Sequence, residues 1–312
     1  MQDVIRPTTI IRAPRLELCL GVKLTIVSET FQFTGSFKFR AAYNLASKVD
    51  QERIITASSG NFGQALAYAC KILGKSCLVV MPHDSAQVKV DAVREYGGEV
   101  DLINVASKSR SDRLSELSRK HPEAYLASAY DDPLVIEGNA TLGQEISGID
   151  WPLDYVLVPI GGGGLSSGIV TGIRRAGLQV DVVGAEPLLA NDAARSLRAG
   201  CIVRDRQESK TIADGARTLG LGQHNWPILQ KGLSDIIEVT EDDIAEAVGL
   251  LFSLANVKAE PTGALGLAAV LSQPGRFRGK SVCCVVSGGN VDPEVYCRLL
   301  RSGGSAPAAH ER

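Results

Sequence analysis

The sequence predicts an α/β protein of two domains, each an open, mostly parallel twisted sheet flanked by helices. Short apolar runs recur along the chain, each run ends in small or polar residues, and a helix-like segment follows it. Because parallel strands must be joined by a crossover connection, usually a helix, this alternation is typical of parallel sheets. The chain of 312 residues, 45% of them hydrophobic, is long enough for two domains with substantial cores.

The first half of the chain carries the clearest strand-and-helix units. A short strand is expected at residues 22–27, and a helix follows at residues 37–45, where Gly35 permits a bend and Ser36 is a good N-cap. Further units of the same kind follow, with strands predicted at residues 54–57, 77–81 and 100–105.

The second half resumes the pattern after a break at residues 130–133. Apolar runs predict buried strands at residues 155–160, 180–185 and 281–286. Periodic apolar spacing predicts helices at residues 139–146, 169–176, 241–254 and 263–271. The alternation therefore continues almost to the end of the chain.

The acidic pair at residues 131–132 is interpreted as a hinge between the two domains. We predict a discontinuous large domain of residues 1–47 and 133–312, and a small domain of residues 48–132. The tail, residues 302–312, consists mainly of small and polar residues and is predicted to be disordered.

Composition and charge exclude several classes of protein. The formal net charge is −2 and no cluster of lysines and arginines persists over a segment, so neither nucleic acid nor an anionic membrane is indicated as a partner. The N-terminus lacks the apolar core of a signal peptide, and no apolar run reaches the length of a membrane span. We therefore expect a cytoplasmic protein that acts on a small molecule.

The seven cysteines show no CxxC spacing, and Cys283 and Cys284 are neighbours within an apolar run. An odd number of cysteines without metal-ligand spacing favours reduced thiols. We expect all of them to be reduced residues of the core, rather than disulfides or metal ligands.

One lysine stands at the start of the helix predicted at residues 37–45. Lys38 follows the turn at Gly35 and falls in the first helical turn. The positive end of the helix dipole disfavours a cation at this place, so a purely structural role is electrostatically poor. The alternative is an ordinary solvated surface lysine, as most lysines are. The other motifs decide between the two.

Four consecutive glycines, Gly161 to Gly164, stand directly after an apolar strand and before a helix. Without a Cβ, successive N–H groups can turn toward one anion, and the helix N-terminus adds partial positive charge. The spacing is neither that of the P-loop nor the GxGxxG of a dinucleotide-binding unit. We interpret the loop as a phosphate cradle, the alternative being a glycine turn without a ligand.

Two further loops follow predicted strands and carry polar side chains. Residues 58–64, SSGNFGQ, offer hydroxyl, amide and N–H groups that can bind a carboxylate, or can form an N-capping turn instead. Residues 287–290, SGGN, follow the last predicted strand, and open parallel sheets bind their ligands at such strand ends.

Taken in order, these motifs resemble the fold-type II family of enzymes that use pyridoxal 5′-phosphate. The motifs are SFK-x-R around Lys38, SSGN-x-GQA at residues 58–65, the four glycines and the closing SGGN. The chain most resembles the serine/threonine dehydratase and serine racemase branch of this family, over residues 6–290. The resemblance implies a tryptophan synthase β-like fold, a cofactor held by the large domain, substrate loops in the small domain, an amino-acid substrate and a homodimer.

The resemblance also implies a role for each motif. Lys38 would form the internal aldimine with the cofactor and, once released, act as general base on the substrate Cα proton. Ser287 would meet the pyridine nitrogen, and a neutral hydroxyl there weakens the electron sink, which fits prompt loss of a β-leaving group. The other residues implied to contact the cofactor are Phe37, Asn61, Gly161, Gly162, Gly163, Gly164, Leu165, Glu260 and Asn290. Those implied to contact the substrate are Ser58, Ser59, Gly60, Asn61, Phe62 and Gln64.

A divalent-cation site beside the glycine loop is a further implication of the resemblance. Glu186 and Asp192 would supply carboxylates and Ala190 its carbonyl oxygen. Oxygen ligands of this kind suit Mg²⁺, Ca²⁺ or Mn²⁺. The alternative is that the two acids belong to a solvated turn.

Ser59 is the residue on which the choice of reaction depends. In racemases of the branch a serine at this point faces the lysine as a second acid/base, whereas several dehydratases have alanine. We expect an ammonia-lyase that converts a 3-hydroxy amino acid such as L-serine or L-threonine to a 2-oxo acid and ammonia. The alternative is an amino-acid racemase that uses Lys38 and Ser59; β-replacement and a non-catalytic protein are less favoured.

The chain departs from the pattern of the branch at positions that shape the pocket. Phe62 stands where the branch usually has histidine, and Asn139 and Ala140 stand where Gln-Gly is usual. These departures favour a larger or less polar 3-hydroxy amino acid than serine or threonine.

Overall fold

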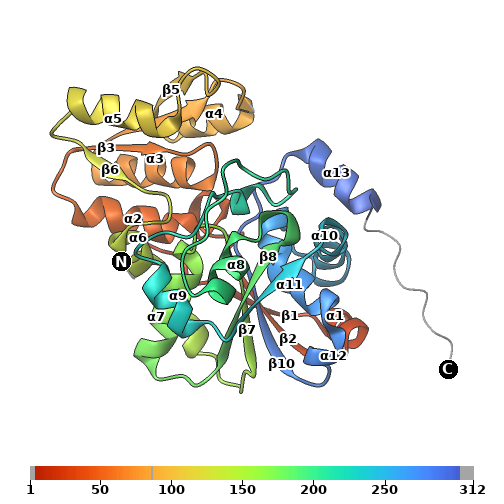
Figure 1. Cartoon of the computed structure of the whole chain (residues 1–312). Helices are drawn as coiled ribbons and strands as arrows, with labels where there is room; N and C mark the ends of the chain where they lie inside the picture. The colour runs from red at the N-terminus through yellow and green to blue at the C-terminus, as the bar shows by residue number, and fades with distance from the viewer. Residues whose placement is uncertain (1–3, 86, 303–312) are drawn as a thin grey trace.

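The structure, a computed structural model that describes residues 4–85 and 87–302, is an α/β protein with two domains on separate sheets (Figure 1). The larger sheet has the strand order β1-β2-β10-β7-β8-β9, and the smaller has the order β5-β4-β3-β6. Within this part of the chain every pair of neighbouring strands is parallel except β1 with β2, so the predicted fold class is confirmed. The strands are β1 (Thr9–Arg12), β2 (Lys23–Ser28), β3 (Arg53–Ala57), β4 (Ser76–Pro82), β5 (Glu99–Ile103), β6 (Tyr125–Ala127), β7 (Tyr155–Pro159), β8 (Asp181–Pro187), β9 (Asp235–Val239) and β10 (Ser281–Val286).

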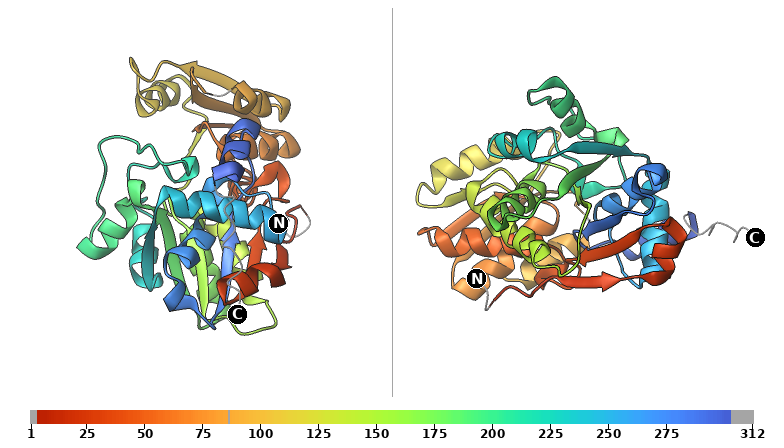
Figure 2. Two further views of the ribbon diagram at one scale, coloured as in Figure 1. Left: turned by 90° about the vertical axis from the view of Figure 1, so that its right-hand side faces the viewer. Right: turned by 90° about the horizontal axis from the view of Figure 1, so that it is seen from below.

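Helices connect the parallel strands and cover both faces of each sheet (Figure 2). The α-helices are α1 (Pro14–Leu20), α2 (Lys38–Lys48), α3 (Asn61–Leu73), α4 (Gln87–Glu95), α5 (Arg110–Lys120), α6 (Pro133–Ser147), α7 (Gly164–Ala176), α8 (Asp192–Ala199), α9 (Trp226–Gly232), α10 (Glu241–Ala255), α11 (Pro261–Ser272), α12 (Pro274–Phe277) and α13 (Pro293–Ser302). Short 3₁₀ turns are η1 (Phe33–Gly35), η2 (Leu188–Ala190) and η3 (Asp214–Ala216).

The central strands are apolar on both faces because both faces are buried. In the large sheet, Val183 of β8 packs in the core formed with α10 and α11, whereas Val182 packs on the opposite face with α7. In the small sheet, Val79 and Val80 of β4 likewise enter different cores. Successive strand residues point to opposite faces, so a doubly covered parallel sheet reads as a continuous hydrophobic run. This explains why these strands were predictable.

Several predicted elements have different ends in the structure. The helix expected at residues 139–146 is α6, which begins at Pro133 because Asp132 caps it, accepting a hydrogen bond of 2.8 Å from the Leu134 N–H. The helix expected at residues 169–176 begins at Gly164, directly at the glycine loop. Strand β9, with acids at both sides of Ile236 and Ile237, was not predicted and is established by its pairing with β8.

The expectation that Ser36 caps the helix after it is wrong. Ser36 has an extended backbone and pairs with Gly288, so that the N-cap position falls on Phe37, which makes no side-chain cap. The Ser36 Oγ is buried and makes no hydrogen bond to another described residue. A long-range strand pairing has therefore replaced the local capping contact that the sequence favours.

The cysteines only partly follow the prediction. All of them are free, and Cys70, Cys77, Cys283 and Cys284 are buried, as expected for reduced core residues. The core assignment is wrong for Cys19, Cys201 and Cys297, which are exposed because they lie on outward-facing parts of α1, α13 and the turn after α8.

Helices α6 and α7 pack closely through glycines, and this contact fixes the position of the glycine loop. A Cβ added at Gly172 would lie 2.2 Å from the Ala140 carbonyl oxygen, and one at Gly143 would lie 2.4 Å from that of Ile169. Only glycine allows backbones to approach this closely. The N-terminus of α7 is therefore held rigidly beside α6.

The helix that carries Lys38 lies between the two domains. α2 packs against α3 of the small domain and against α6, and Figure 1 shows it below the small sheet.

The predicted domain boundaries at residues 47–48 and 132–133 stay a prediction. None of the helices in residues 4–85 and 87–302 is long and apolar enough to cross a membrane. Of the expected disordered tail, residue 302 ends α13, and residues 303–312 lie outside the described residues.

Candidate active site

The turn before Lys38 places this residue at the carboxyl end of β10. Thr34 and Gly35 have positive φ angles of 60° and 73°. A Cβ at Gly35 would lie 2.3 Å from Asn290 Oδ1, so this close approach requires glycine. The Phe37 N–H then donates a hydrogen bond of 2.9 Å to the Ser287 carbonyl oxygen. The first and last motifs of the chain are therefore joined backbone to backbone.

The Lys38 amine is enclosed by apolar and carbonyl groups. Its Nζ donates a hydrogen bond of 2.8 Å to the Ala129 carbonyl oxygen and lies 5.0 Å from the centre of the Phe37 ring and 5.7 Å from that of Phe62. Burial lowers the pKa of Lys38 to about 8, although the negative charge of Glu260 acts in the opposite direction. Lys38 therefore loses its proton more readily than an ordinary surface lysine does.

Glu260 is the buried acid of the site and occupies the N-cap position of α11. Burial raises the pKa of this carboxyl to about 8, reinforced by the charge of Asp214 and opposed by a hydrogen bond from Asn61. Lys38 and Glu260 thus titrate in the same pH range and influence each other, so their protonation is a property of the pair.

A chain of hydrogen bonds joins three of the predicted motifs. Asn61 Nδ2 donates to Glu260 Oε1 at 2.8 Å. Asn290 Nδ2 donates to Asn61 Oδ1 at 2.9 Å and to the Thr34 carbonyl oxygen at 2.7 Å. Asn61 belongs to the small domain and the other residues to the large one. The loop at residues 58–64 is therefore tied to the lysine turn across the domain boundary.

The glycine loop follows β7 and starts α7, as predicted, and presents free N–H groups. The N–H groups of Gly161, Gly162 and Gly163 donate no hydrogen bond to any residue of the described ranges. Gly163 has a φ angle of 93°, which favours glycine. Consecutive free donors at the start of a long helix are suited to an anion such as a phosphate.

Tyr130 and Asn225 support the glycine loop and were missed from the sequence. A Cβ at Gly162 would lie 2.2 Å from the Tyr130 ring. Asn225 Nδ2 donates to the carbonyl oxygens of Gly162 at 2.8 Å and of Tyr130 at 3.0 Å. Ala129, which accepts the Lys38 hydrogen bond, directly precedes Tyr130. None of these residues stands in a motif, and only the break at residues 130–133 indicated that the segment is irregular.

The loop at residues 58–64 forms the N-terminus of α3. Ser58 Oγ accepts a hydrogen bond of 3.2 Å from the Gly63 N–H, and Gly60 provides no side-chain cap for the helix. A Cβ at Gly60 would meet nothing within 4 Å, so the loop surface is open there. The side chains of Phe62 and Gln64 are buried, whereas Ser59 is half-buried. Leu165, in the first turn of α7, is buried.

The two acids of the expected cation site lie close together beside α8. Glu186 accepts hydrogen bonds from the N–H groups of Ala193 and Ala194, at 3.2 and 2.6 Å, and burial raises its pKa well above the usual value. Burial raises the pKa of Asp192 to about 7, and its Oδ2 is buried without a hydrogen-bond partner in the described chain. Ala190 is buried in the 3₁₀ turn between them. Residues 4–85 and 87–302 contain no group of three or more His, Cys, Asp or Glu side chains that could hold a metal ion.

Two ion pairs connect the small domain to the segment between α8 and α9. Lys89 Nζ of α4 lies 2.8 Å from Asp214 Oδ2, and Arg110 of α5 pairs with Glu208. Arg110 and Asp131 also influence the ionisation of Tyr130, whose pKa burial raises. These cations therefore join the small domain to the segment between α8 and α9, and the charge of Arg110 also acts on Tyr130.

We expect Lys38 to become reactive toward an acylating reagent with a midpoint near pH 8, measured by mass spectrometry of its peptide across a pH series. Below that pH the ammonium form dominates and is not nucleophilic, and above it the amine is free. Glu260→Gln should lower the midpoint, because ionised Glu260 favours the ammonium form. The control is Glu52→Gln, at an exposed acid before β3. A midpoint unchanged in Glu260→Gln would contradict the coupling.

Comparison with known proteins agrees with this geometry. The chain matches the family described as pyridoxal-phosphate dependent enzymes over residues 1–288. It is 36% identical to the L-threo-3-hydroxyaspartate ammonia-lyase of Pseudomonas sp over 298 residues, which cover 94% of this chain and 93% of that protein. It is 35% identical to the serine racemase of Schizosaccharomyces pombe over 276 residues, 87% of this chain and 85% of that protein. The solved structure of a T.th. threonine deaminase matches with a TM-score of 0.88 at 38% identity, over 93% of this chain and 95% of that one. The chain therefore belongs to the fold-type II family of pyridoxal-phosphate dependent enzymes.

Proposed function

We propose that this protein is an ammonia-lyase that converts a 3-hydroxy amino acid to a 2-oxo acid and ammonia by β-elimination. The observation that carries this proposal is a buried lysine amine with a pKa of about 8, held at the end of β10 near free N–H groups of a glycine loop. The names of several relatives, among them hydroxyaspartate ammonia-lyases and a dehydratase, support elimination.

The residues present fit pyridoxal phosphate. The free N–H groups of Gly161 to Gly163 suit its phosphate, the Lys38 amine suits its aldehyde, and the buried Ser287 hydroxyl suits its ring nitrogen. Leu165, Phe37, Asn61, Glu260 and Asn290 complete the proposed surroundings. When bound, the cofactor supplies an electron sink for the electron pair left at the substrate Cα.

Side chains of this protein would carry out the proton transfers of the reaction. Lys38, with its pKa near neutrality, is suited to remove the Cα proton, because a base works best when its pKa is close to the working pH. The N-terminus of α3, where the N-cap residue Gly60 offers no side chain, suits the substrate carboxylate, with Ser58, Gly60 and Gln64 around it. Ser59 stands in the same loop as the second proton carrier that racemisation would need.

A chiral assay of the amino acid, run beside a keto-acid assay, tests the reaction. Lys38→Ala should lower both activities at least about 100-fold, since it removes the general base. Ser59→Ala should leave keto-acid formation within a few fold of wild type, and should lower any racemisation about 100-fold. Equal loss of both activities in Ser59→Ala would contradict a role of Ser59 in racemisation alone. Racemisation faster than elimination in the wild type would favour the racemase instead.

We further propose that the substrate carries a second carboxylate, as the name of the Pseudomonas relative indicates for that protein. Arg110 supports this proposal, because it is a cation of the small domain whose charge acts on Tyr130, the residue that packs on Gly162. A side-chain carboxylate paired with such an arginine is bound by charge-assisted hydrogen bonds. This preference would replace the expectation of serine, threonine or a less polar 3-hydroxy amino acid.

For 3-hydroxyaspartate, Arg110→Gln should lower kcat/KM roughly tenfold to a hundredfold, the range expected for a charged hydrogen bond. For serine the same substitution should have little effect. The matched control is Arg175→Gln, which breaks an exposed pair with Glu137 on the α6–α7 surface. Faster turnover of serine or threonine than of 3-hydroxyaspartate by the wild type would refute this substrate preference.

We also propose that a divalent cation binds between Glu186, Asp192 and the Ala190 carbonyl. Burial raises the pKa values of both acids, and Asp192 Oδ2 has no hydrogen-bond partner among the described residues. A bound cation would stabilise the ionised carboxylates and would give Asp192 Oδ2 a ligand to bind. Mg²⁺, Ca²⁺ or Mn²⁺ should raise the unfolding temperature of the wild type but not of Asp192→Asn. Asp242→Asn, at an exposed acid of α10, should respond like the wild type. An equal response in Asp192→Asn would rule out this site.

A further inference from the structure

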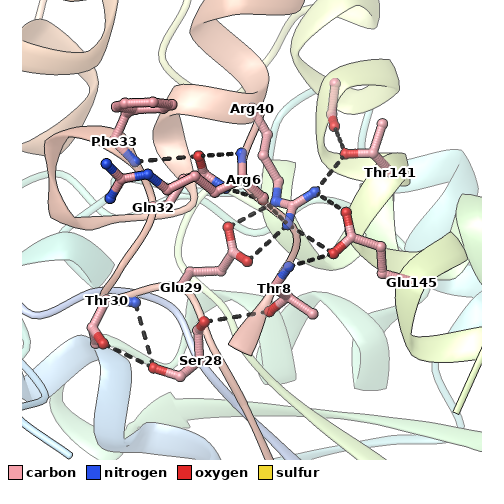
Figure 3. A network of polar contacts seen from close by, with 11 residues as sticks. Arg6, Thr8, Ser28, Glu29, Thr30, Gln32, Phe33, Arg40, Thr141 and Glu145 are labelled. Atoms are coloured by element: carbon pink, nitrogen blue, oxygen red, sulfur yellow. Dashed lines mark hydrogen bonds and ion pairs between the residues drawn. The ribbon is translucent and has the colours of Figure 1, made fainter. Parts of the chain in front are cut away.

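A buried guanidinium two residues after Lys38 holds three parts of the structure together. The Arg40 side chain is fully buried. It forms a two-bond pair with Glu29, at 2.7 and 2.9 Å, and another with Glu145, at 2.6 and 3.1 Å. It also donates to Thr141 Oγ1 at 3.1 Å and to the Arg6 carbonyl oxygen at 3.4 Å. Figure 3 shows the guanidinium between the two carboxylates.

The two carboxylates come from segments that also contact the candidate active site through other groups. Glu29 follows β2, and its N–H donates a hydrogen bond of 2.9 Å to the Val286 carbonyl oxygen, beside Ser287. Glu145 belongs to α6, and in the same helix Asn139 Nδ2 donates to the Gly164 carbonyl oxygen at 3.0 Å. Arg40 thereby links the lysine helix to the end of β10 and to the glycine loop.

The N-terminal arm closes this network. The Thr8 N–H donates to Glu145 Oε2 at 2.6 Å, and Gln32 exchanges hydrogen bonds with the backbone of Arg6. The Arg6 guanidinium lies 4.2 Å from the centre of the Phe33 ring. The arm therefore lies directly against the ion pairs of Arg40 (Figure 3).

Arg40 affects where Lys38 lies rather than the charge of Lys38. The pKa of Lys38 is set by burial and by Glu260, and its Nζ binds the Ala129 carbonyl. The rigid fork of an arginine can fix two carboxylates in one plane, which the single ammonium of a lysine cannot do. A buried pair of this kind is also weak evidence for stability alone, because desolvation opposes the attraction.

We propose that Arg40 is a positioning residue that fixes Lys38 relative to Ser287 and the glycine loop, so that Lys38 captures the cofactor aldehyde. In this capture the Lys38 nitrogen bonds to the aldehyde carbon, and the aldehyde oxygen leaves as water. The inference rests on cofactor binding as in the proposed function, and it does not depend on which reaction follows.

The test measures how fast the full-length protein, freed of cofactor with hydroxylamine, captures added pyridoxal phosphate. Stopped-flow absorbance follows the lysine-bound form, and borohydride reduction with mass spectrometry locates the linkage. Arg40→Lys should slow capture roughly tenfold to a hundredfold, because small errors in position are costly. The midpoint of its pH profile should stay near pH 8. Glu145→Gln should slow capture by a smaller factor.

The control is Phe277→Leu, which removes packing around a buried ring against Tyr155, in α12. It should lower the unfolding temperature but leave the capture rate unchanged. Wild-type capture rates in both Arg40→Lys and Glu145→Gln would overturn the inference, as would equal slowing in Phe277→Leu or a moved pH midpoint. If Arg40→Lys does not fold, Glu145→Gln alone decides. A wild type that captures the cofactor but eliminates no substrate would refute only the proposed function.

Discussion

The burial of one ammonium group at the start of α2 is the constraint on which the candidate site depends. A lysine side chain loses its hydration there, and the pKa of Lys38 falls to about 8 in consequence. One carbonyl oxygen, that of Ala129, partly replaces the lost water. The backbone that carries the lysine is then held from two sides, by Ser287 before the helix and by the Arg40 ion pairs within it. The amine therefore loses its proton more readily than an exposed lysine does, and its position is fixed.

The topology of the two sheets brings the remaining groups to this amine. β10 and β7 run parallel, so the SGGN loop and the glycine loop emerge at the same edge of the large sheet. β3 of the small sheet ends at the loop of residues 58–64, and Asn61 crosses the domain boundary to Glu260 and Asn290. Motifs that are far apart in the sequence therefore become one site, because parallel strands share a direction.

Burial in the site makes the charged forms of Lys38 and Glu260 less stable than they are in water. Burial brings the pKa values of Lys38 and Glu260 both to about 8, so the two groups share their protons, and Lys38 gives up its proton more readily than an exposed lysine does. Free N–H groups, rather than lysines or arginines, line the glycine loop. The cations Lys89 and Arg110 stand farther out, at the domain boundary. This distribution suits an anionic cofactor inside and a charged substrate that enters between the domains.

The sequence by itself determined the fold class and most of the candidate site residues. Continuous apolar runs indicate doubly covered parallel strands, and Lys38, the four glycines, Asn61 and Ser287 each stand in a motif that local chemistry can interpret. Tertiary structure alone decided that Ser36 pairs with Gly288 instead of capping a helix, and that Tyr130 and Asn225 support the glycine loop. It also decided that Arg40 is fully buried between Glu29 and Glu145. These contacts join residues far apart in the chain, and the pKa of Lys38 depends on burial by several elements at once. No local pattern carries that information, because desolvation and long-range pairing exist only once the chain has folded.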